Sequence, residues 1–85
     1  MRRDIELKNR DRFITLGITI SYYRKLRGMT QEQLADRVGI SRSHLGCIEA
    51  PNCVQSFSLD ILYGIADALD ISPSDLLSET YALIK

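Results

Sequence analysis

Apolar residues recur at helical spacing along most of this chain, and short polar or glycine-containing breaks divide them into segments. Between positions 13 and 26, Phe13, Leu16, Ile20 and Tyr23 follow the three- and four-residue steps of one helix face. Gly28 comes directly after this run, at a place where a left-handed glycine often ends a helix. The pattern therefore predicts a first helix that ends just before residue 28.

Two short helical segments follow, with a glycine between them. Thr30, with a glutamine three residues later, forms a capping box, so a helix should begin here and bury Leu34, Ala35 and Val38. Ala35 must be small because the next helix is expected to cross closely there. Gly39 supplies the positive φ that the tight turn requires.

The next helix is predicted to begin after Ser41, its N-cap, and to bury Leu45 and Ile48, which lie one turn apart on its inner side. Pro51 ends it, since proline cannot continue a helix. A short helix, a tight turn and a second short helix form a helix-turn-helix over about residues 31–50. Its outward residues are small or polar and free to face a groove: Arg42, Ser43, Gly46 and Cys47.

Two more helices are predicted towards the C-terminus. Ser58 caps the fourth, and Ser72 with Pro73 begins a short fifth that runs through Leu76 and Leu77. The inner face of the fourth helix is expected to contain Leu59, Leu62, Ile65, Ala66 and Leu69. No strand pattern and no internal repeat interrupts this series, which indicates a compact all-α domain of five helices over residues 13–78.

The two ends of the chain differ from this domain. Residues 1–12 are densely charged and nearly free of core residues, which favours a flexible arm or a frayed first turn. Its basic residues, including Arg2, Arg3 and Lys8, could follow DNA, although interleaved acidic residues weaken that case. The tail, residues 79–85, carries Tyr81, Leu83 and Ile84, which extend the fifth helix or pack on a partner.

Composition limits the function classes. The chain has 85 residues, 45% of them apolar, which suits one small globular domain. No apolar run approaches the roughly 20 residues that cross a bilayer, and the charged N-terminus does not resemble a signal peptide, so we expect a cytoplasmic protein. An enzyme is not expected, because His44 is the only histidine and no paired carboxylates or phosphate-binding glycine loop are evident.

The two cysteines, Cys47 and Cys53, are not expected to form a disulfide framework in a chain without a secretion signal. Their spacing matches no zinc motif, so we expect no metal and no cofactor. We interpret them as structural or incidental, and the sequence leaves a redox role open.

Charge is unevenly distributed, although its sum is zero. Residues 1–50 contain ten Lys/Arg and six Asp/Glu, a balance of +4, and residues 51–85 contain one and five, a balance of −4. One face meeting phosphate and the other facing away would explain this asymmetry. Chance in a short chain is the alternative.

An ordered set of motifs makes the interpretation more specific. The stretch LGITISYYRKLRGMTQEQLADRVGISRSHLGCIE, followed later by LYGIADALDISPSDLL, resembles the phage-repressor-like (Cro-type) helix-turn-helix family over about residues 16–78. The matching positions are Gly17, Ile20, Arg24, Thr30, Gln31, Leu34, Ala35, Ser41, Ile48 and Glu49. The resemblance implies a lambda-repressor-like fold and a sequence-specific transcriptional regulator of double-stranded DNA, most often a repressor.

The resemblance also implies roles for individual residues. The recognition helix, about residues 41–50, would enter the major groove, where Arg42 is suited to bidentate pairing with guanine. Gln31 would contact phosphate, and Arg24 with Glu49 would form a structural ion pair. The full set of expected DNA-binding residues is Gln31, Ser41, Arg42, Ser43, His44, Cys47, Tyr22 and Asn52.

Several of these residues have an ordinary alternative. For Tyr22 an ordinary surface position is favoured over a phosphate contact, and Lys25 and Arg27, which could also reach DNA, are more often solvated. Cys47 is equally compatible with a contact to a thymine methyl and with a neutral surface residue. The chain departs from the family after Glu49, where it reads Ala-Pro-Asn instead of an early glycine. The following loop is about two residues longer than usual and has no Lys or Arg, which puts its phosphate contacts in doubt.

Three functional hypotheses remain at this point. The first is a homodimeric regulator without a small-molecule ligand, whose dimer surface includes Leu76, Tyr81, Leu83 and Ile84 and whose half-sites lie about 34 Å apart. The second is an antitoxin or a controller of a restriction system or mobile element. The third is a protein-interaction module that has lost DNA binding, which the zero net charge favours.

Overall fold

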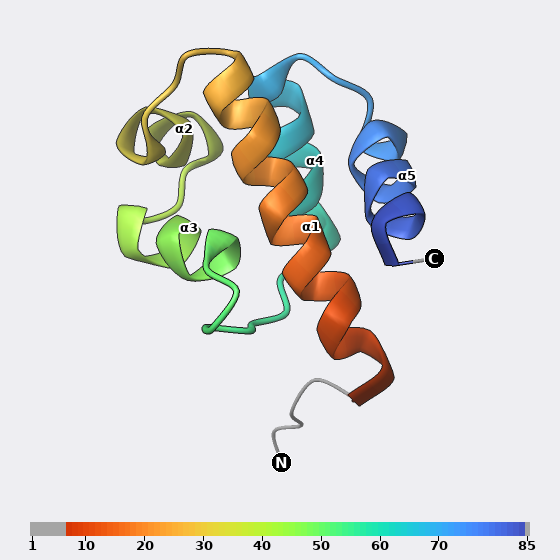
Figure 1. Ribbon diagram of the computed structural model, residues 1–85. Helices are drawn as coiled ribbons and strands as arrows, with labels where there is room; N and C mark the ends of the chain where they lie inside the picture. The colour runs from red at the N-terminus through yellow and green to blue at the C-terminus, as the bar shows by residue number, and fades with distance from the viewer. Residues whose placement is uncertain (1–6, 85) are drawn as a thin grey trace.

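The computed structural model describes the backbone of residues 7–84 and the side chains of residues 9–78. It contains α1 (Leu7–Leu26), α2 (Gln31–Val38), α3 (Arg42–Glu49), α4 (Leu59–Leu69) and α5 (Pro73–Ile84) (Figure 1). The described residues form helices and connecting loops, with no strand. The predicted all-α class with five helices is therefore confirmed.

The long helix α1 is central to the arrangement. It packs against α5 on one side and α3 on the other, while α2 packs against α3 and α4. In Figure 1, α2 and α3 lie at one edge of the molecule and α5 lies at the opposite edge. The helix-turn-helix unit is thus separated from the C-terminal helix by α1 and α4.

The predicted ends of the short helices are present. The hydroxyl of Thr30 accepts a hydrogen bond from Gln33 N at 3.1 Å, and the Gln33 side chain accepts one from Thr30 N at 2.9 Å, which completes the capping box. Ser41 and Ser58 cap α3 and α4 with the hydroxyl bond alone, accepting from His44 N and Ile61 N. At the end of α4, Asp70 has a left-handed backbone, with φ of 58°.

The core lies where all five helices meet. Its members are apolar and nearly inaccessible: Leu16, Ile20, Leu34, Ala35, Leu45, Ile48, Leu62, Ile65, Ala66, Leu69 and Leu76. In the part of the chain whose side chains are described, every buried side-chain nitrogen and oxygen has a hydrogen-bond partner. For example, the hydroxyl of Thr19, inside α1, donates to the Thr15 carbonyl at 2.9 Å.

Three expectations about these helices are wrong. Residues 7–12 belong to α1, although Arg10, Asp11 and Arg12 are exposed, and Arg12 Nη1 donates to Asn9 Oδ1 at 3.0 Å on this part of the helix. Leu59 is 63% exposed, because it lies in the first turn of α4, directly after an exposed loop. Leu76 is completely buried within the monomer, so it does not belong to a dimer surface; its neighbour Leu77 is half exposed.

Some expectations concern residues that the structure does not describe. The side chains of Tyr81, Leu83 and Ile84 lie outside the described set, as do Arg2, Arg3 and the Lys8 side chain. Among the described residues, no helix is both long and apolar enough to pass through a membrane.

Gly17 is the point of closest approach between α1 and α3. A Cβ atom at this position would overlap the carbonyl oxygen of Ile48 and lie 3.3 Å from Glu49 Cα. These are backbone atoms, which cannot move aside as a flexible side chain can. The crossing therefore requires a residue without a side chain.

We expect Gly17→Ala to lower the free energy of unfolding by about 1–3 kcal/mol, because α1 and α3 must move apart. Urea unfolding followed by far-UV circular dichroism measures this change. Gly46→Ala is the matched control, since its Cβ would lie 3.8 Å from Gln31 Oε1, an ordinary contact. The control should gain about 0.5–1 kcal/mol from helix propensity; equal effects of the two substitutions would contradict the close-crossing argument.

Candidate nucleic-acid interface

Helices α2 and α3 form the predicted helix-turn-helix. Gly39, with φ of 86°, ends α2 and donates from its N–H to the Ala35 carbonyl at 2.8 Å. Two residues later Ser41 begins α3, which is held from inside by the fully buried Leu45 and by Ile48. The turn is short because glycine can adopt the left-handed backbone without steric cost.

The first turn of α3 is the most exposed part of this helix. Arg42 and Ser43 are exposed, and the first amides of a helix have no intrahelical acceptor. Ser41 Oγ accepts from His44 N at 3.0 Å, which leaves its hydroxyl hydrogen free to donate outwards. The His44 side chain is half-buried. The geometry thus offers a guanidinium, two hydroxyls and backbone donors together at one helix end.

A buried ion pair holds this unit against α1. Arg24 Nε lies 2.8 Å from Glu49 Oε2, and Arg24 Nη2 lies 3.0 Å from Glu49 Oε1, so the contact is bidentate. The side chains are only 10% and 5% exposed. Arg24 Nη1 also donates to the Met29 carbonyl at 2.7 Å. The ion pair expected from the family resemblance is present, and it links the end of α1 to the end of α3.

Gln31 completes this network. Its Nε2 donates to Glu49 Oε1 at 3.0 Å, so the first residue of α2 is attached to the last residue of α3. A glutamine amide has two hydrogens, and this bond uses one of them. A phosphate contact from Gln31 stays a prediction, but the structure adds a second role that the sequence did not indicate.

The cysteines differ from the expectation. Cys47, on the last turn of α3, and Cys53, in the loop after it, form a disulfide with a Cα–Cα distance of 5.3 Å. The expectation that they form no disulfide is therefore wrong, because the longer loop folds back far enough to bring the two residues together. Cys47 has no free thiol in this form. In the chain-entropy model, a closed loop of this size stabilises the fold by roughly 2 kcal/mol.

The remaining predicted residues flank α3. Asn52 lies at the exposed tip of the loop that the disulfide closes. Tyr22 is 59% exposed on α1, where it lines a shallow hollow of about 290 Å³ with Ile18, Lys25 and Glu49. Lys25 is thus placed beside the network that holds α3, which the sequence alone did not show. The sequence signal for this position of Lys25 was its three-residue spacing from Tyr22, which puts both residues on the same face of α1.

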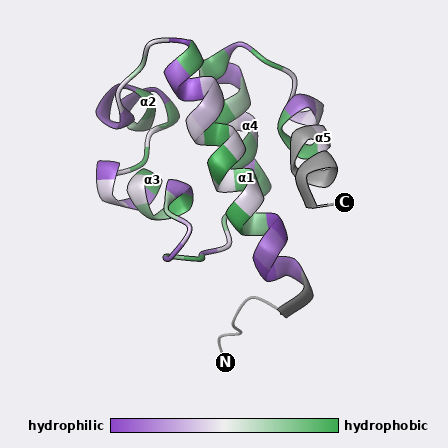
Figure 2. Ribbon diagram, in the orientation of Figure 1, coloured by the Kyte–Doolittle hydropathy of each residue, from purple (hydrophilic) through white to green (hydrophobic). Residues whose placement is uncertain are grey.

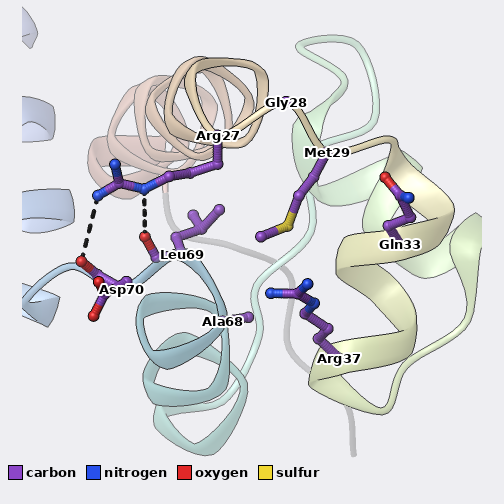
Figure 3. Close-up of a pocket in the computed structure, with 8 residues that line it drawn as sticks. All are labelled: Arg27, Gly28, Met29, Gln33, Arg37, Ala68, Leu69 and Asp70. Carbon is purple, nitrogen blue, oxygen red and sulfur yellow. Dashed lines mark hydrogen bonds between the residues drawn. The ribbon is translucent and has the colours of Figure 1, made fainter.

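Arg27, by contrast, has a structural role. Its Nε donates to the Leu69 carbonyl at 2.8 Å, and its Nη2 lies 3.4 Å from the Asp70 carbonyl oxygen (Figure 3). It therefore satisfies carbonyls at the C-terminal end of α4. Arg37 lines the same pocket, which is formed by the turn after α1, by α2 and by the end of α4, and which contains no residue of α3. This pocket lies apart from the candidate interface.

The electrostatics of the unit are weaker than the charge asymmetry suggested. Between residues 31 and 49, two arginines are opposed by Glu32, Asp36 and Glu49, a formal balance of −1. Adding Arg24, the partner of Glu49, brings the balance to zero. Hydrophilic ribbon segments occur on α2 and α3 in Figure 2, but also on the coloured part of α1 that follows its grey first turn. Arg42 is the one cation on the exposed side of α3.

A capped helix, a glycine turn and a second capped helix, fixed by a buried ion pair, define a helix-turn-helix protein. The chain belongs to the Helix-turn-helix family, which matches residues 20–76. No group of histidine, cysteine or acidic side chains suited to a metal ion occurs among the described residues.

Three known proteins illustrate the similarity. The HTH-type transcriptional regulator SinR of Bacillus subtilis is 33% identical over 78% of this chain, and the match spans 59% of SinR. The immunity repressor protein of Bacillus phage phi105 is 39% identical over 78% of this chain and 44% of its own length. The chain thus spans about half the length of these relatives. The crystal structure of C.AhdI, a restriction-modification controller protein from Aeromonas hydrophila, superposes with a TM-score of 0.70. It is 33% identical and covers 75% of this chain and 94% of its own.

We expect Arg24→Met to lower the free energy of unfolding by about 3–5 kcal/mol, because it leaves Glu49 buried without its cation. Chemical denaturation measures the loss. Arg37→Met is the matched control: Arg37 is exposed and makes no hydrogen bond or ion pair within the described residues. The control should change stability by less than about 0.5 kcal/mol. Similar small effects for both variants would show that the pair does not stabilise the fold.

Proposed function

We propose that this protein is a sequence-specific regulator of transcription that binds double-stranded DNA, and that α3 is its recognition helix. The observation that carries the proposal is the exposed first turn of α3, with Arg42 and Ser43 outward while Leu45 and Ile48 anchor the other side. A helix held in this way can enter the major groove without rearranging the core. The names of the relatives, which are regulators and a repressor rather than enzymes, agree with this function.

Individual residues have distinct parts in the proposal. Arg42 reads guanine by bidentate hydrogen bonds, and Ser43 and His44 contact bases or phosphate beside it. Gln31, Ser41, Tyr22 and Asn52 position the protein by donating to phosphate oxygens. We add Lys25 to this second group because it lies beside Tyr22 and Glu49. Cys47, being bonded to Cys53, is not proposed as a free base contact.

The regulator is proposed to act as a homodimeric repressor in the cytoplasm, without a small-molecule ligand. One recognition helix makes too few base contacts for useful selectivity among genomic sites, so two copies on neighbouring half-sites are needed. The phage immunity repressor supports the repressor assignment. Leu77, half exposed on α5, replaces Leu76 as a residue of the proposed dimer surface.

A controller of a restriction-modification system is the second candidate. The favouring observation is the likeness to C.AhdI, a restriction-modification controller protein, which superposes with a TM-score of 0.70 at 33% identity. Both candidates bind DNA through the same helix, so they differ in the genes controlled and not in the interface.

Selection of bound duplexes from a random DNA pool should yield a palindromic site with half-sites about one helical turn apart. Arg42→Ala should weaken binding to that duplex by about 10- to 100-fold and relax the preference at one base pair per half-site. Arg37→Ala, which changes the same charge outside the interface, is the control and should bind as the unmodified protein does. An intact footprint for Arg42→Ala would show that α3 is not the reading helix.

Salt dependence separates a DNA regulator from an interaction module that has lost DNA binding. In the proposed complex, Arg42 and Lys25 of each protomer displace counterions, so the slope of log K against log salt should be about −2 per protomer. Filter binding or fluorescence anisotropy between 50 and 300 mM salt, roughly the range in which such slopes are measured, gives this value. Lys25→Ala should make the slope shallower by about 1. A flat dependence, or absent binding, would favour the interaction module.

A further inference from the structure

The Cys47–Cys53 disulfide joins the last turn of α3 to the loop between α3 and α4. We propose that this cystine is a reversible thiol–disulfide exchange site whose oxidation state sets the affinity for DNA, the oxidised form binding more tightly. The inference rests on the proposed function, because it concerns the flank of the proposed recognition helix. The disulfide is reduced by a dithiol or by two monothiols, which supply the electrons.

The disulfide is the main restraint on this loop. Among the described residues, Pro51, Asn52, Gln55 and Ser56 are exposed and make no hydrogen bond. Apart from the disulfide, the loop is held by two backbone bonds of 3.2 Å, from Ala50 N to the Cys47 carbonyl and from Cys53 N to the Ala50 carbonyl, and by the half-buried Val54. Opening the S–S bond therefore gives the segment from residue 50 to 56 many more conformations.

The rest of the fold does not depend on this bond. Neither cysteine belongs to the buried core. On one side of the loop, Ile48 is buried and Glu49 is bound to Arg24. On the other side, the Phe57 ring packs edge-on against Phe13, with ring centroids 5.7 Å apart. Reduction thus frees a short peripheral segment while α3 stays attached to α1. This is what a regulatory disulfide requires, because the fold must persist in both oxidation states.

The exchange chemistry is accessible. Cys53 is exposed, so a thiolate of the reductant can attack its sulfur, form a mixed disulfide and release Cys47 as a thiolate that takes up a proton. The second thiol of the reductant then displaces Cys53. Overall, two electrons and two protons pass to the cysteines, and the reductant becomes a disulfide. Disulfides of proteins in a reducing compartment, where the proposed function places this one, are usually transient and redox-sensing.

The direction of the expected change in DNA affinity follows from the conformational entropy that the loop after α3 loses on binding. The oxidised protein already holds Asn52 next to the end of α3, whereas the reduced protein must order the loop when it meets the phosphate backbone. We expect the dissociation constant for the selected duplex to rise by about tenfold on reduction.

The test uses the full chain, purified under air, and the duplex obtained from the random pool. Alkylation followed by mass spectrometry should find both cysteines bonded, and both free after treatment with dithiothreitol. Anisotropy titrations of the two forms should differ by about tenfold in dissociation constant, with unchanged far-UV circular dichroism. Cys53→Ser is the matched variant, since it removes the bridge and leaves residue 47 on α3 intact. With reductant present throughout to keep its thiol free, it should bind as weakly as the reduced protein.

Each other outcome overturns the inference in a distinguishable way. Dissociation constants within twofold of each other, or tighter binding by the reduced form, would refute the switch and leave the proposed function standing. Loss of the far-UV circular dichroism signal on reduction would show that the fold itself requires the disulfide, and would refute the switch. Free thiols in the air-purified protein would show that the disulfide does not form, and would refute the switch. A protein that enriches no duplex in either oxidation state would refute the proposed function together with this inference.

Discussion

The buried pair of Arg24 and Glu49 is the interaction on which the helix-turn-helix depends. Two charges that are almost inaccessible to water are tolerable only when their geometry is good and their remaining hydrogen-bonding groups are satisfied. Here both conditions are met: the contact is bidentate, and Met29 and Gln31 supply the additional partners. The ends of α1 and α3 and the start of α2 are therefore placed relative to one another by a single carboxylate and a single guanidinium.

Steric constraints reinforce this electrostatic one. Gly17 allows the backbone of α1 to touch that of α3 immediately before Glu49, so the pair can form at short range. On the far side, Ala35 is buried where α2 meets the turn at Gly39. Any larger side chain at Gly17 would push α3 away from the arginine that holds it. The exposed first turn of α3 is thus oriented by residues that do not themselves face the proposed DNA.

The proposed DNA interface depends on geometry more than on charge. The unit from residue 31 to 49 is not basic, and the loop after α3 contributes polar groups but no cation. The disulfide between Cys47 and Cys53 fixes that loop against α3, the proposed recognition helix. Preorganisation of this kind lowers the cost of binding without adding contacts.

Local sequence patterns were enough to predict the features that depend on neighbours three or four positions away. Thr30 with Gln33, the serine caps and the glycine turns were readable because a cap and its amide lie within one helical turn. The apolar spacing likewise identified nearly all of the core, and the family resemblance identified the Arg24–Glu49 pair.

Other features depend on residues that are distant along the chain or on the path of a loop, and these could be seen only in the folded structure. Leu76 is buried and Leu59 exposed because of where α5 and the start of α4 lie, and Arg27 reaches Leu69 across 42 positions. Gln31 turns towards Glu49, and Cys47 is joined to Cys53, because folding brings together groups whose separation no local pattern can specify.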